Sequence, residues 1–336
     1  MNDMKLAHFR QALAGHRDAL VEWMHADAPH KDVHLGGREI KEVIQIVSQI
    51  KESLEQIDNG RFGVCRQCQG QVETERLEMD YTTQVCLDHF TSQQIQALEA
   101  DLELAARVQK ELLPCCVPVQ SGMEIAAHTL SARIVSGDYY DFFLTKNGAQ
   151  GLALADVMGK GLPASMLMSN LQASLRILGP QHEELHLLAD RLNQLFRFNL
   201  KLIKFISLFL AAIDRNAGIL RYCNAGHHPG IYYNAVSKSI QWLEPTGPAI
   251  GLTKSAEFTS AKINFRDGDV FVFYTDGLVE ARNSQQEEFG ENRLHDFVKN
   301  HAHKAAANMM TALQETLKDF TASFHDDVTI LAVKIV

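Results

Sequence analysis

The stretch Gly151-Leu-Ala-Leu-Ala-Asp156-Val-Met-Gly159-Lys-Gly161 joins an apolar run to a carboxylate and two glycines. The apolar run has the pattern of a buried strand, so Asp156 is expected at the end of a strand. Gly159 and Gly161 allow the backbone to turn sharply there, because glycine adopts unusual backbone angles at little steric cost. Pro163 suits the first turn of a helix, so a helix is predicted to begin here. A carboxylate between a strand and a glycine-rich turn is typical of a functional site.

Three further groups of aspartates lie far apart in the sequence, each beside a strand-like run. They are Gly137-Asp138-Tyr139-Tyr140-Asp141, Tyr274-Thr275-Asp276-Gly277 and His325-Asp326-Asp327-Val328. Carboxylates that folding brings together repel one another and raise one another's pKa unless cations neutralise them. Hard divalent cations prefer oxygen ligands. The four groups together predict a Mg²⁺ or Mn²⁺ centre, although any one aspartate taken alone would more often be a turn residue or a helix cap.

Alternation of strands and helices predicts the fold class from residue 123 onward. Helical stretches are expected at 161–178, 184–203 and 291–319, which fits helices that cover the faces of largely antiparallel sheets in an α+β protein. The short β-like runs are 124–130, 151–157, 205–213, 219–223, 269–274 and 328–335.

Five motifs in a fixed order carry a family resemblance over about residues 100–336. They are Ser136-Gly-Asp-Tyr-Tyr-Asp141, Ala155-Asp-Val-Met-Gly-Lys-Gly161, Asn224-Ala-Gly-His227, Tyr274-Thr-Asp-Gly-Leu-Val-Glu-Ala281 and Asp326-Asp-Val-Thr-Ile-Leu-Ala-Val333. In this order they resemble the SpoIIE/RsbU branch of the metal-dependent PPM (type 2C) serine/threonine phosphatases. The resemblance implies an α/β/β/α sandwich with metals between the sheets at one edge. Ser136 departs from the family pattern, which usually has a glycine there.

The resemblance also implies roles for the acidic residues. Asp156 is expected to bridge two Mn²⁺ or Mg²⁺ ions, with the carbonyl oxygen of Val157 as a further ligand. Asp138 is expected to bind one ion. The other ion is assigned to Asp276 and Asp326, and these four aspartates form the predicted catalytic set.

Asp327 is a further candidate metal ligand, and it ranks with Asp141 as a residue that supports the ligands. His227 and His228 are either proton donors or structural hydrogen-bonding residues, and beside a glycine-rich turn the structural role is commoner. Lys160 either meets phosphate or is solvated. The sequence shows no Gly-x-Ser-x-Gly elbow and no cysteine phosphate loop, so attack by water between two ions about 3.5–4 Å apart is predicted.

Composition limits the classes of partner. The chain has 336 residues, of which 46% are hydrophobic and 22% charged, enough for two globular domains. A net charge of −9 argues against a broad grip on nucleic acid, so a protein partner is expected instead. The start of the sequence lacks an apolar signal core, and the strongest apolar run, 205–213, is too short to span a bilayer. We therefore expect a cytoplasmic protein without membrane contact.

Two amphipathic helices are predicted in residues 1–60. The first has apolar residues at helical spacing over residues 4–24, and the second has them at alternating steps of three and four. We expect a helical hairpin or coiled coil, in which the second seam either pairs within one chain or forms a dimer interface. The apolar positions are Leu6, Phe9, Leu13, Leu20 and Trp23, then Ile40, Val43, Val47, Ile50, Leu54 and Ile57.

Residues 61–90 contain two pairs of potential metal ligands, Cys65 with Cys68 and Cys86 with His89. Thiolates and imidazole suit tetrahedral Zn²⁺, and four protein ligands leave no open coordination position, so one structural zinc is predicted. Residues 37–90 resemble a DksA/TraR-type zinc finger. That resemblance implies an interaction module related to RNA polymerase regulators.

Residues 91–114 are expected to form a helix that links the finger to a catalytic domain at 115–336. Thr91 and Gln94 have capping-box spacing, and the stretch from Ala106 to Pro114 resembles the helix that precedes the catalytic domain of RsbU-type phosphatases. In that family the helix transmits an input signal to the metal site. The alternative is that residues 91–114 form only a spacer helix that ends at Pro114. We hypothesise that this helix pairs in a homodimer, with Ala105 and Gln109 on a seam that is otherwise filled by Ile95, Leu98, Leu102 and Leu112. The packing in which Gln109 is buried and hydrogen-bonded is expected to align the strand that carries Asp138.

The predicted function is a metal-dependent serine/threonine phosphatase that acts on a phosphorylated regulatory protein. The resemblance implies that this protein is an anti-sigma-factor antagonist. Two alternatives belong to other classes: a catalytically silent adaptor, and a regulator that binds RNA polymerase through the zinc finger. Metal-dependent hydrolysis of a phosphate ester separates the enzyme from the silent adaptor.

Overall fold

The computed structural model divides the chain into two compact units. The first comprises Met1–Asp101 and Phe198–Lys204, and the second comprises Leu102–Arg197 and Phe205–Val336. We predicted that the catalytic domain begins at residue 115, and the compact unit begins earlier, inside the linker helix. The described residues are 6–7, 9–11, 13–15, 17–18, 21, 40–79, 82–159, 161–199, 205–253 and 256–336.

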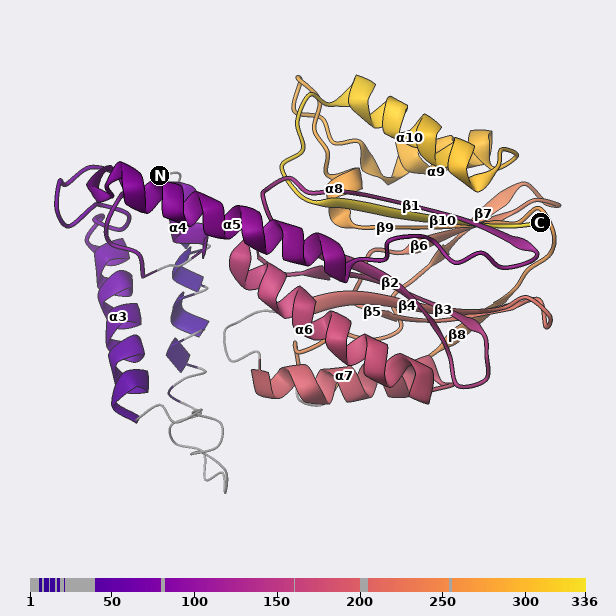
Figure 1. Ribbon diagram of the computed structural model, residues 1–336, viewed down its shortest axis with the longest axis horizontal. Coiled ribbons are helices and arrows are strands. Elements are labelled where there is room, and N and C mark those ends of the chain that lie inside the picture. The colour runs from indigo at the N-terminus through magenta and orange to yellow at the C-terminus, as the bar shows by residue number, and fades with distance from the viewer. Residues whose placement is uncertain are drawn as a thin grey trace. The chain divides into compact units, whose positions relative to one another are not determined.

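The first unit is built around α3 (Ile40–Asp58), α4 (Thr74–Met79) and the 3₁₀ turn η1 (Leu87–His89) (Figure 1). The described residues of the preceding stretch, from Leu6 to Val21, are helical. Leu20, Trp23 and the predicted loop that follows them lie outside the described residues. One buried cluster joins this stretch, α3 and the finger; it contains Phe9, Leu13, Val47, Ile50, Ile57, Phe62, Cys65, Val72, Leu77 and Cys86.

The predicted seam of α3 is confirmed at the positions that the structure describes. Val47, Ile50 and Ile57 are buried, and Leu54 packs against the same cluster. Phe9 of the first helical stretch belongs to that cluster, so the seam is filled within one chain. This favours helix pairing over a dimer interface for α3.

The linker helix α5 (Ser92–Leu112) begins with the predicted capping box. The backbone N–H of Thr91 donates to Oε1 of Gln94 (2.9 Å), and the N–H of Gln94 donates to Oγ1 of Thr91 (3.2 Å). The two side chains therefore satisfy each other's free amide at the helix start. Most residues of α5 are exposed.

The second unit contains two five-stranded antiparallel sheets. The first sheet has the order β1 (Met123–Leu130), β10 (Val328–Ile335), β9 (Val270–Tyr274), β6 (Gly230–Asn234), β7 (Ser239–Leu243). The second has the order β2 (Asp138–Leu144), β3 (Gln150–Val157), β4 (Ile206–Asp214), β5 (Ile219–Ala225), β8 (Ala261–Asn264). The predicted strands are thus confirmed, whereas β2, β6, β7 and β8 were not identified as strands from the sequence.

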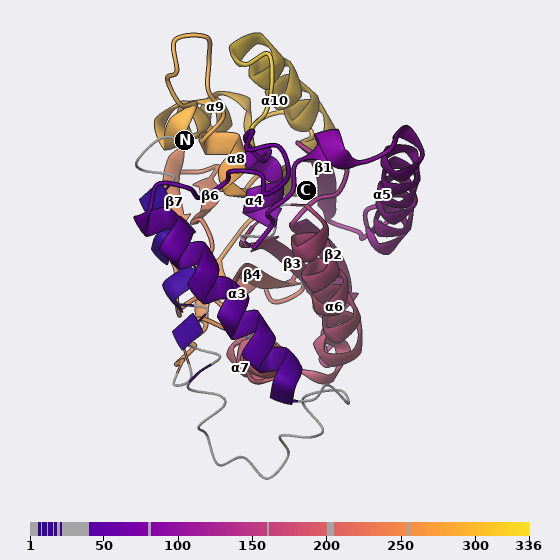
Figure 2. The same ribbon diagram turned by 90° about the vertical axis from the view of Figure 1, so that its left-hand side faces the viewer.

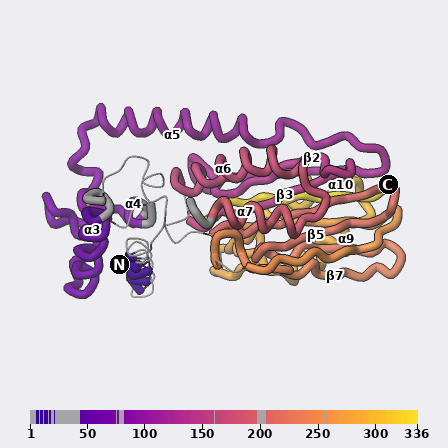
Figure 3. The backbone as a smooth tube through the Cα atoms, turned by 90° about the horizontal axis from the view of Figure 1, so that it is seen from below, coloured from indigo at the N-terminus to yellow at the C-terminus, as the bar shows by residue number. Residues whose placement is uncertain are grey.

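Helices cover the outer face of each sheet. α6 (Leu162–Leu178) and α7 (Leu185–Asn199) lie on the second sheet, and α9 (Gly290–His301) and α10 (Ala306–Phe320) lie on the first (Figures 1 and 2). Figure 3, seen from the side of α6 and α7, shows both helices lying over the second sheet. We predicted one helix over 291–319; the structure has two, separated at residues 302–305. None of the described helices has the length and apolarity that a bilayer span requires.

A buried apolar layer lies between the two sheets. Along β10, Leu331, Val333 and Ile335 belong to this layer, whereas Val328, Ile330 and Ala332 belong to the layer under α9 and α10. This period of two is the expected alternation of side chains along a strand. In the same layer the ring of Phe209 in β4 stacks on Tyr222 of β5 and contacts Phe273 of β9. The apolar layer therefore holds the sheets face to face and fixes which residues point between them.

Candidate active site and metal centre

The inter-sheet layer changes from apolar to polar at one end of the second sheet. Asp138 of β2 lies directly opposite Asp156 of β3, and Asp156 lies opposite Ser207 of β4. Paired residues of antiparallel strands share a face of the sheet. Leu154 lies two positions before Asp156, Phe209 lies two positions after Ser207, and both belong to the inter-sheet layer. The three polar side chains therefore form a row that faces the space between the sheets.

Asp138 is the most buried carboxylate of this row, with 3% of its surface exposed. Burial, followed by the nearby charge of Asp156, raises the pKa of Asp138 well above its ordinary value. Two like charges directly opposite each other on neighbouring strands are destabilising. Both can be ionised at neutral pH only if cations neutralise them, so the pair has the charge requirement of a metal site.

Gly137 allows the start of β2 to approach the predicted bridging residues closely. A Cβ atom at this glycine would lie 3.1 Å from the carbonyl oxygen of Val157 and 3.6 Å from Oδ1 of Asp156. After Val157 the chain turns through Gly159 and Gly161, whose φ values of 102° and 72° require glycine, as predicted. The side chain of Asp156 and the carbonyl oxygen of Val157 thus lie beside the backbone that carries Asp138.

Asp276 and Asp326 lie in a second acidic group. Asp276 begins the short helix α8 (Asp276–Val279), and a Cβ atom on the next residue, Gly277, would lie 2.0 Å from the carbonyl oxygen of Asp327. The first turn of α8 therefore rests on the backbone of the Asp326-Asp327 pair. Glu280 lies within the field of this group, because burial, Asp276, Glu288 and Asp326 all raise its pKa.

Among the described residues, no three of the carboxylates come within 4.8 Å of one another. They form two groups, Asp138 with Asp156 and Asp276 with Asp326. Asp327 lies near the first group, since its charge also raises the pKa of Asp138. Closer approach of all four would require cations, because like charges repel.

Asp327 holds the loop that leads into β2. Its Oδ1 accepts the N–H of Ala132 (2.8 Å), and its Oδ2 accepts the N–H of Gly137 (2.8 Å). Both oxygens are thus used by the backbone next to Asp138. This geometry agrees with a supporting role better than with direct metal binding.

Asp141 does not lie where we predicted. It accepts a hydrogen bond from the Tyr139 hydroxyl (2.5 Å) and pairs with Nε of Arg176 in α6 (2.9 Å). Because side chains alternate along β2, Tyr139 and Asp141 face α6, whereas Asp138 and Tyr140 face the other sheet. Asp141 therefore supports the contact of β2 with α6 and does not support the metal ligands directly.

His227 is buried beside the acidic row, with 3% of its surface exposed. Its Nδ1 lies 2.7 Å from the hydroxyl oxygen of Ser207, and its backbone N–H donates to Oδ1 of Asn224 (2.8 Å). Burial lowers the pKa of His227 to about 3. A ring that is neutral and enclosed favours the structural role over the proton donor.

Two threonines near Asp138 were not identified from the sequence. The hydroxyls of Thr275 and Thr329 donate to Oδ2 of Asp138, at 2.8 and 2.7 Å. Both lie in motifs that we used for the resemblance, but neither received a role. For Thr275 the sequence held a usable pattern. Phe271, Phe273 and Thr275 lie at every second position, so Thr275 is expected to face the second sheet as the two phenylalanines do.

Gln109 connects α5 to the strand of Asp138 and is 6% exposed. Its Nε2 donates to the carbonyl oxygen of Ser136 (2.6 Å), and its Oε1 accepts the N–H of the same residue (2.9 Å). The Ser136 hydroxyl oxygen in turn accepts the N–H of Asp138 (3.0 Å). Gln109 is thus buried and hydrogen-bonded, as hypothesised, but against Ser136 of its own chain and not on the predicted homodimer seam. Ser136, the residue that departs from the family pattern, thus connects Gln109 to Asp138.

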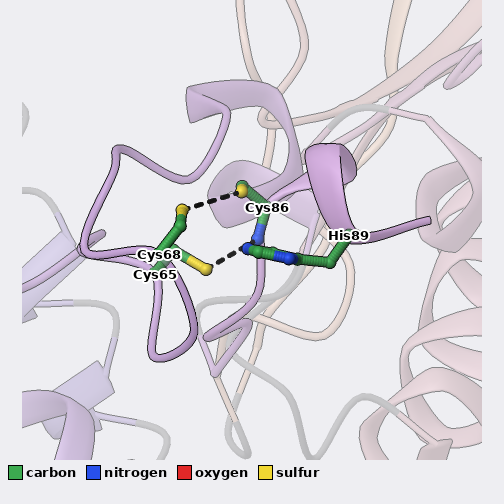
Figure 4. A group of neighbouring side chains, drawn as sticks. All are labelled: Cys65, Cys68, Cys86 and His89. Carbon is green, nitrogen blue, oxygen red and sulfur yellow. Dashed lines mark hydrogen bonds between the residues drawn. The ribbon is translucent and has the colours of Figure 1, made fainter.

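The cysteine and histidine ligands of the first unit form one compact group (Figure 4). One ligand atom from each of Cys65, Cys68, Cys86 and His89 lies within 4.8 Å of the others. The Sγ atoms of Cys68 and Cys86 are 3.6 Å apart. The four residues that we predicted as ligands therefore meet at one point.

Backbone amides surround the sulfur atoms. The N–H groups of Gln67 and Cys86 point to Sγ of Cys65 (3.4 and 3.5 Å), and that of Gly70 points to Sγ of Cys68 (3.3 Å). Burial raises the pKa of Cys65, but backbone hydrogen bonds outweigh burial and lower it to about 6. Burial and the neighbouring thiols raise the pKa of Cys86 to about 11. The group favours a thiolate, which is the form that binds metal.

Comparisons with known proteins agree with the second unit. Residues 146–336 match the family model described as stage II sporulation protein E (SpoIIE). The chain is 29% identical over 242 residues to the phosphoserine phosphatase RsbU of Bacillus subtilis, covering 71% of each protein. It is 24% identical over 241 residues to the phosphoserine phosphatase RsbP of the same organism, covering 70% of this chain and 58% of RsbP.

Solved structures resemble the same part of the chain. The RsbU and RsbW domains of Rv1364c from Mycobacterium tuberculosis align with a TM-score of 0.59 and 27% identity, over 67% of this chain and 63% of that one. The SiaA-PP2C domain of Pseudomonas aeruginosa aligns with a TM-score of 0.62 and 20% identity, over 72% and 98%, which shows a shared fold. With its two helix-covered sheets and this match to the family model, the chain belongs to the SpoIIE family and has a phosphatase domain of the SpoIIE/RsbU type.

Proposed function

We propose that this protein is a metal-dependent serine/threonine phosphatase that hydrolyses phosphoserine or phosphothreonine on a regulatory protein. The observation that carries the proposal is the buried Asp138 directly opposite Asp156 at the polar end of the inter-sheet layer. A purely structural site has no reason to oppose two carboxylates in this way, since the pair is destabilising without a cation.

The donor set fits two hard divalent ions. Asp138, Asp156, Asp276 and Asp326, with the carbonyl oxygen of Val157, would hold these ions. All these donors are oxygens, which Mg²⁺ and Mn²⁺ prefer. When bound, the ions supply Lewis acidity to the phosphate and acidify water.

The chain's own residues orient this site. Gly137 and Gly277 permit close backbone approach, Asp327 holds the loop before β2, and Ser207 with His227 lines the far side of Asp156. These contacts define the positions of the carboxylates before substrate arrives, so little reorganisation is needed during reaction.

The substrate class follows from the relatives. RsbU and RsbP of Bacillus subtilis are named phosphoserine phosphatases, and the solved relative from Mycobacterium tuberculosis joins an RsbU domain to an RsbW domain. We extend this to a phosphorylated regulatory protein, an anti-sigma-factor antagonist, as substrate here.

The cysteine and histidine group of the first unit is proposed to hold one structural Zn²⁺. Zn–S bonds of about 2.3 Å in a tetrahedron imply sulfur atoms roughly 3.8 Å apart, close to the 3.6 Å between Cys68 and Cys86. Amide donors to Cys65 and Cys68 supply the outer hydrogen bonds usual around metal ligands. The DksA/TraR-like character of this finger and a contact with RNA polymerase stay predictions.

α5 is proposed to form a homodimer and to transmit input. Leu98, which lies on the predicted seam, is 46% exposed, and Leu104 and Val108, on another side of the helix, are each 52% exposed. The same helix reaches Asp138 through Gln109 and Ser136. A change in how α5 packs against the second unit would therefore alter the position of a metal ligand.

Manganese-dependent hydrolysis of p-nitrophenyl phosphate by the full chain tests the proposal. Turnover that requires Mn²⁺ or Mg²⁺, is lost with chelator and is absent in Asp156→Asn is expected. A phosphoserine peptide should be hydrolysed as well. A folded wild type that binds Mn²⁺ without any turnover would support the silent adaptor instead.

A further inference from the structure

We propose that Thr275 and Thr329 are positioning residues that make Asp138 a one-oxygen metal ligand. Their two hydroxyls occupy Oδ2 of Asp138, so that Oδ1 alone is presented to the ion. This inference rests on the proposed phosphatase function. It assigns a role to two residues that do not themselves touch the metals or the substrate.

The direction of each hydrogen bond can be deduced from its partners. The Thr275 hydroxyl oxygen accepts the backbone N–H of Thr329 (2.9 Å), so its own proton is free to point to Oδ2 of Asp138 (2.8 Å). The Thr329 hydroxyl lies 3.0 Å from that of Thr129 and 2.7 Å from the same Oδ2. The Thr329 hydroxyl donates its one proton to Asp138, so in its contact with Thr129 it accepts and Thr129 donates.

Regular backbone pairing fixes both donors. Thr329 lies in β10 opposite Thr129 of β1, and the N–H of Thr275 donates to the carbonyl oxygen of Thr329 (3.0 Å). The oxygens of the two hydroxyls therefore have little freedom to move. Asp138 belongs to the other sheet, so the two hydrogen bonds also join the two sheets at the end where the ligands gather.

This arrangement has a consequence for coordination. Oδ2 has two lone-pair directions, and two hydroxyls satisfy both. Among the described residues no hydrogen bond reaches Oδ1 of Asp138. The donors thus act as the outer hydrogen-bond partners of a ligating carboxylate and fix its rotation, which leaves Oδ1 for the ion. Loss of such outer partners typically weakens metal affinity about 10–100-fold.

Matched substitutions in the full chain test the inference. Thr275→Val and Thr329→Val keep the branched shape and remove the hydroxyl, whereas Thr275→Ser and Thr329→Ser keep the hydroxyl and remove a methyl group. Thr129→Val is the control, because it contacts Thr329 without touching Asp138. The readouts are Mn²⁺ affinity, measured by electron paramagnetic resonance of free Mn²⁺, and thermal unfolding of the metal-free protein.

We expect the valine variants to bind Mn²⁺ roughly 10-fold or more weakly, and the serine variants and Thr129→Val to stay near the wild type. A role in packing alone predicts the reverse order, since valine fills the site better than serine. Valine variants with wild-type affinity would overturn the inference while leaving the phosphatase proposal intact. If one valine variant does not fold, the other decides. A wild type that binds no Mn²⁺ overturns both.

Discussion

The two candidate metal sites of this protein are built in opposite ways. The four ligands of the finger lie within residues 65–89 and meet at one point in the structure. The predicted acidic ligands extend from residue 138 to residue 326: Asp138 lies in β2, Asp156 in β3, Asp276 in α8 and Asp326 just before β10. A local set of sulfur and nitrogen donors that closes on itself suits a structural ion. A dispersed set of oxygens, held by hydroxyls and amides from two sheets, suits ions that must leave room for substrate.

The largest expected effect tests the dispersed site. Asp156→Asn should reduce Mn²⁺-dependent turnover by more than the ~10–100-fold that outer partners cost, because it removes the residue that both ions share. The fold should be retained, since the substitution also relieves repulsion with Asp138. Steady-state kinetics with p-nitrophenyl phosphate and circular dichroism measure the two parts.

Asp141→Asn is the matched control for that experiment. Asp141 also lies in the acidic motif, but it faces α6 and pairs with Arg176. We expect it to change stability with little effect on the Mn²⁺ requirement. If Asp141→Asn removed activity as fully as Asp156→Asn, our division of the two faces of β2 would be wrong.

Substitution of a ligand in the cysteine and histidine cluster should unfold the first unit and leave hydrolysis at the acidic site unchanged. Cys65→Ser is expected to lose one equivalent of zinc together with ordered structure in the first unit, because zinc binding contributes roughly 10–16 kcal/mol in small zinc modules. Elemental analysis and limited proteolysis check this. Wild type purified without chelators and found free of zinc would contradict the assignment.

Gln109→Leu tests whether α5, the helix that follows the cysteine and histidine cluster, affects the acidic site. It leaves the N–H and C=O of Ser136 without their partner, a cost of about 1–3 kcal/mol for a buried group. We expect basal turnover to fall several-fold while zinc content stays at the wild-type value. Gln96→Leu, an exposed position of α5, is the control.

Increased turnover in Gln109→Leu would mean that the observed packing of α5 restrains the site and does not support it. Sedimentation of both variants and the wild type tests the proposed homodimer in the same samples. A wild type that is monomeric with unchanged turnover in Gln109→Leu would leave α5 as a simple tether.

The prediction with the smallest effect on turnover at neutral pH concerns the dependence of stability on pH. Burial lowers the pKa of His227 from 6.5 to about 3 in the folded protein. The unfolded chain therefore binds the proton more readily, and stability is lost as the pH falls from about 6.5 toward 3, by up to roughly 1.4 kcal/mol per pH unit. His227→Asn should flatten this part of the curve in urea unfolding. If the free energy of unfolding of His227→Asn fell with pH as steeply as that of the wild type, other groups would cause the loss of stability in acid.

The cysteine and histidine cluster was predictable almost completely from the sequence. Its ligand spacing is local, so Cys65, Cys68, Cys86 and His89 could be named before any fold was known. The same holds for the capping box at Thr91 and for the glycine turn after Asp156. In each case the interacting groups lie close in sequence, and their chemistry restricts the geometry.

The acidic site was predictable in its members but not in their arrangement. The family resemblance made Asp138 a ligand and Asp141 a supporting residue, but it could not show that Asp141 faces α6, because only the pairing of β2 decides which face each side chain takes. It also missed β2 itself, whose two aspartates and two tyrosines interrupt an apolar pattern. The role of Thr329 was equally hidden, since its partner Asp138 is 191 positions away.

By itself, then, the sequence determined which chemical groups the protein has and which of them act locally: the soft ligands of the finger, the carboxylates at strand ends and the apolar period of each strand. Only the tertiary structure decided which carboxylates face each other, which hydroxyls hold Asp138 and how Gln109 reaches Ser136. These depend on the register of antiparallel strands and on the contact of two sheets. A register shift of one residue would turn the side chains of the shifted strand, such as Asp138 or Thr329, to the opposite face.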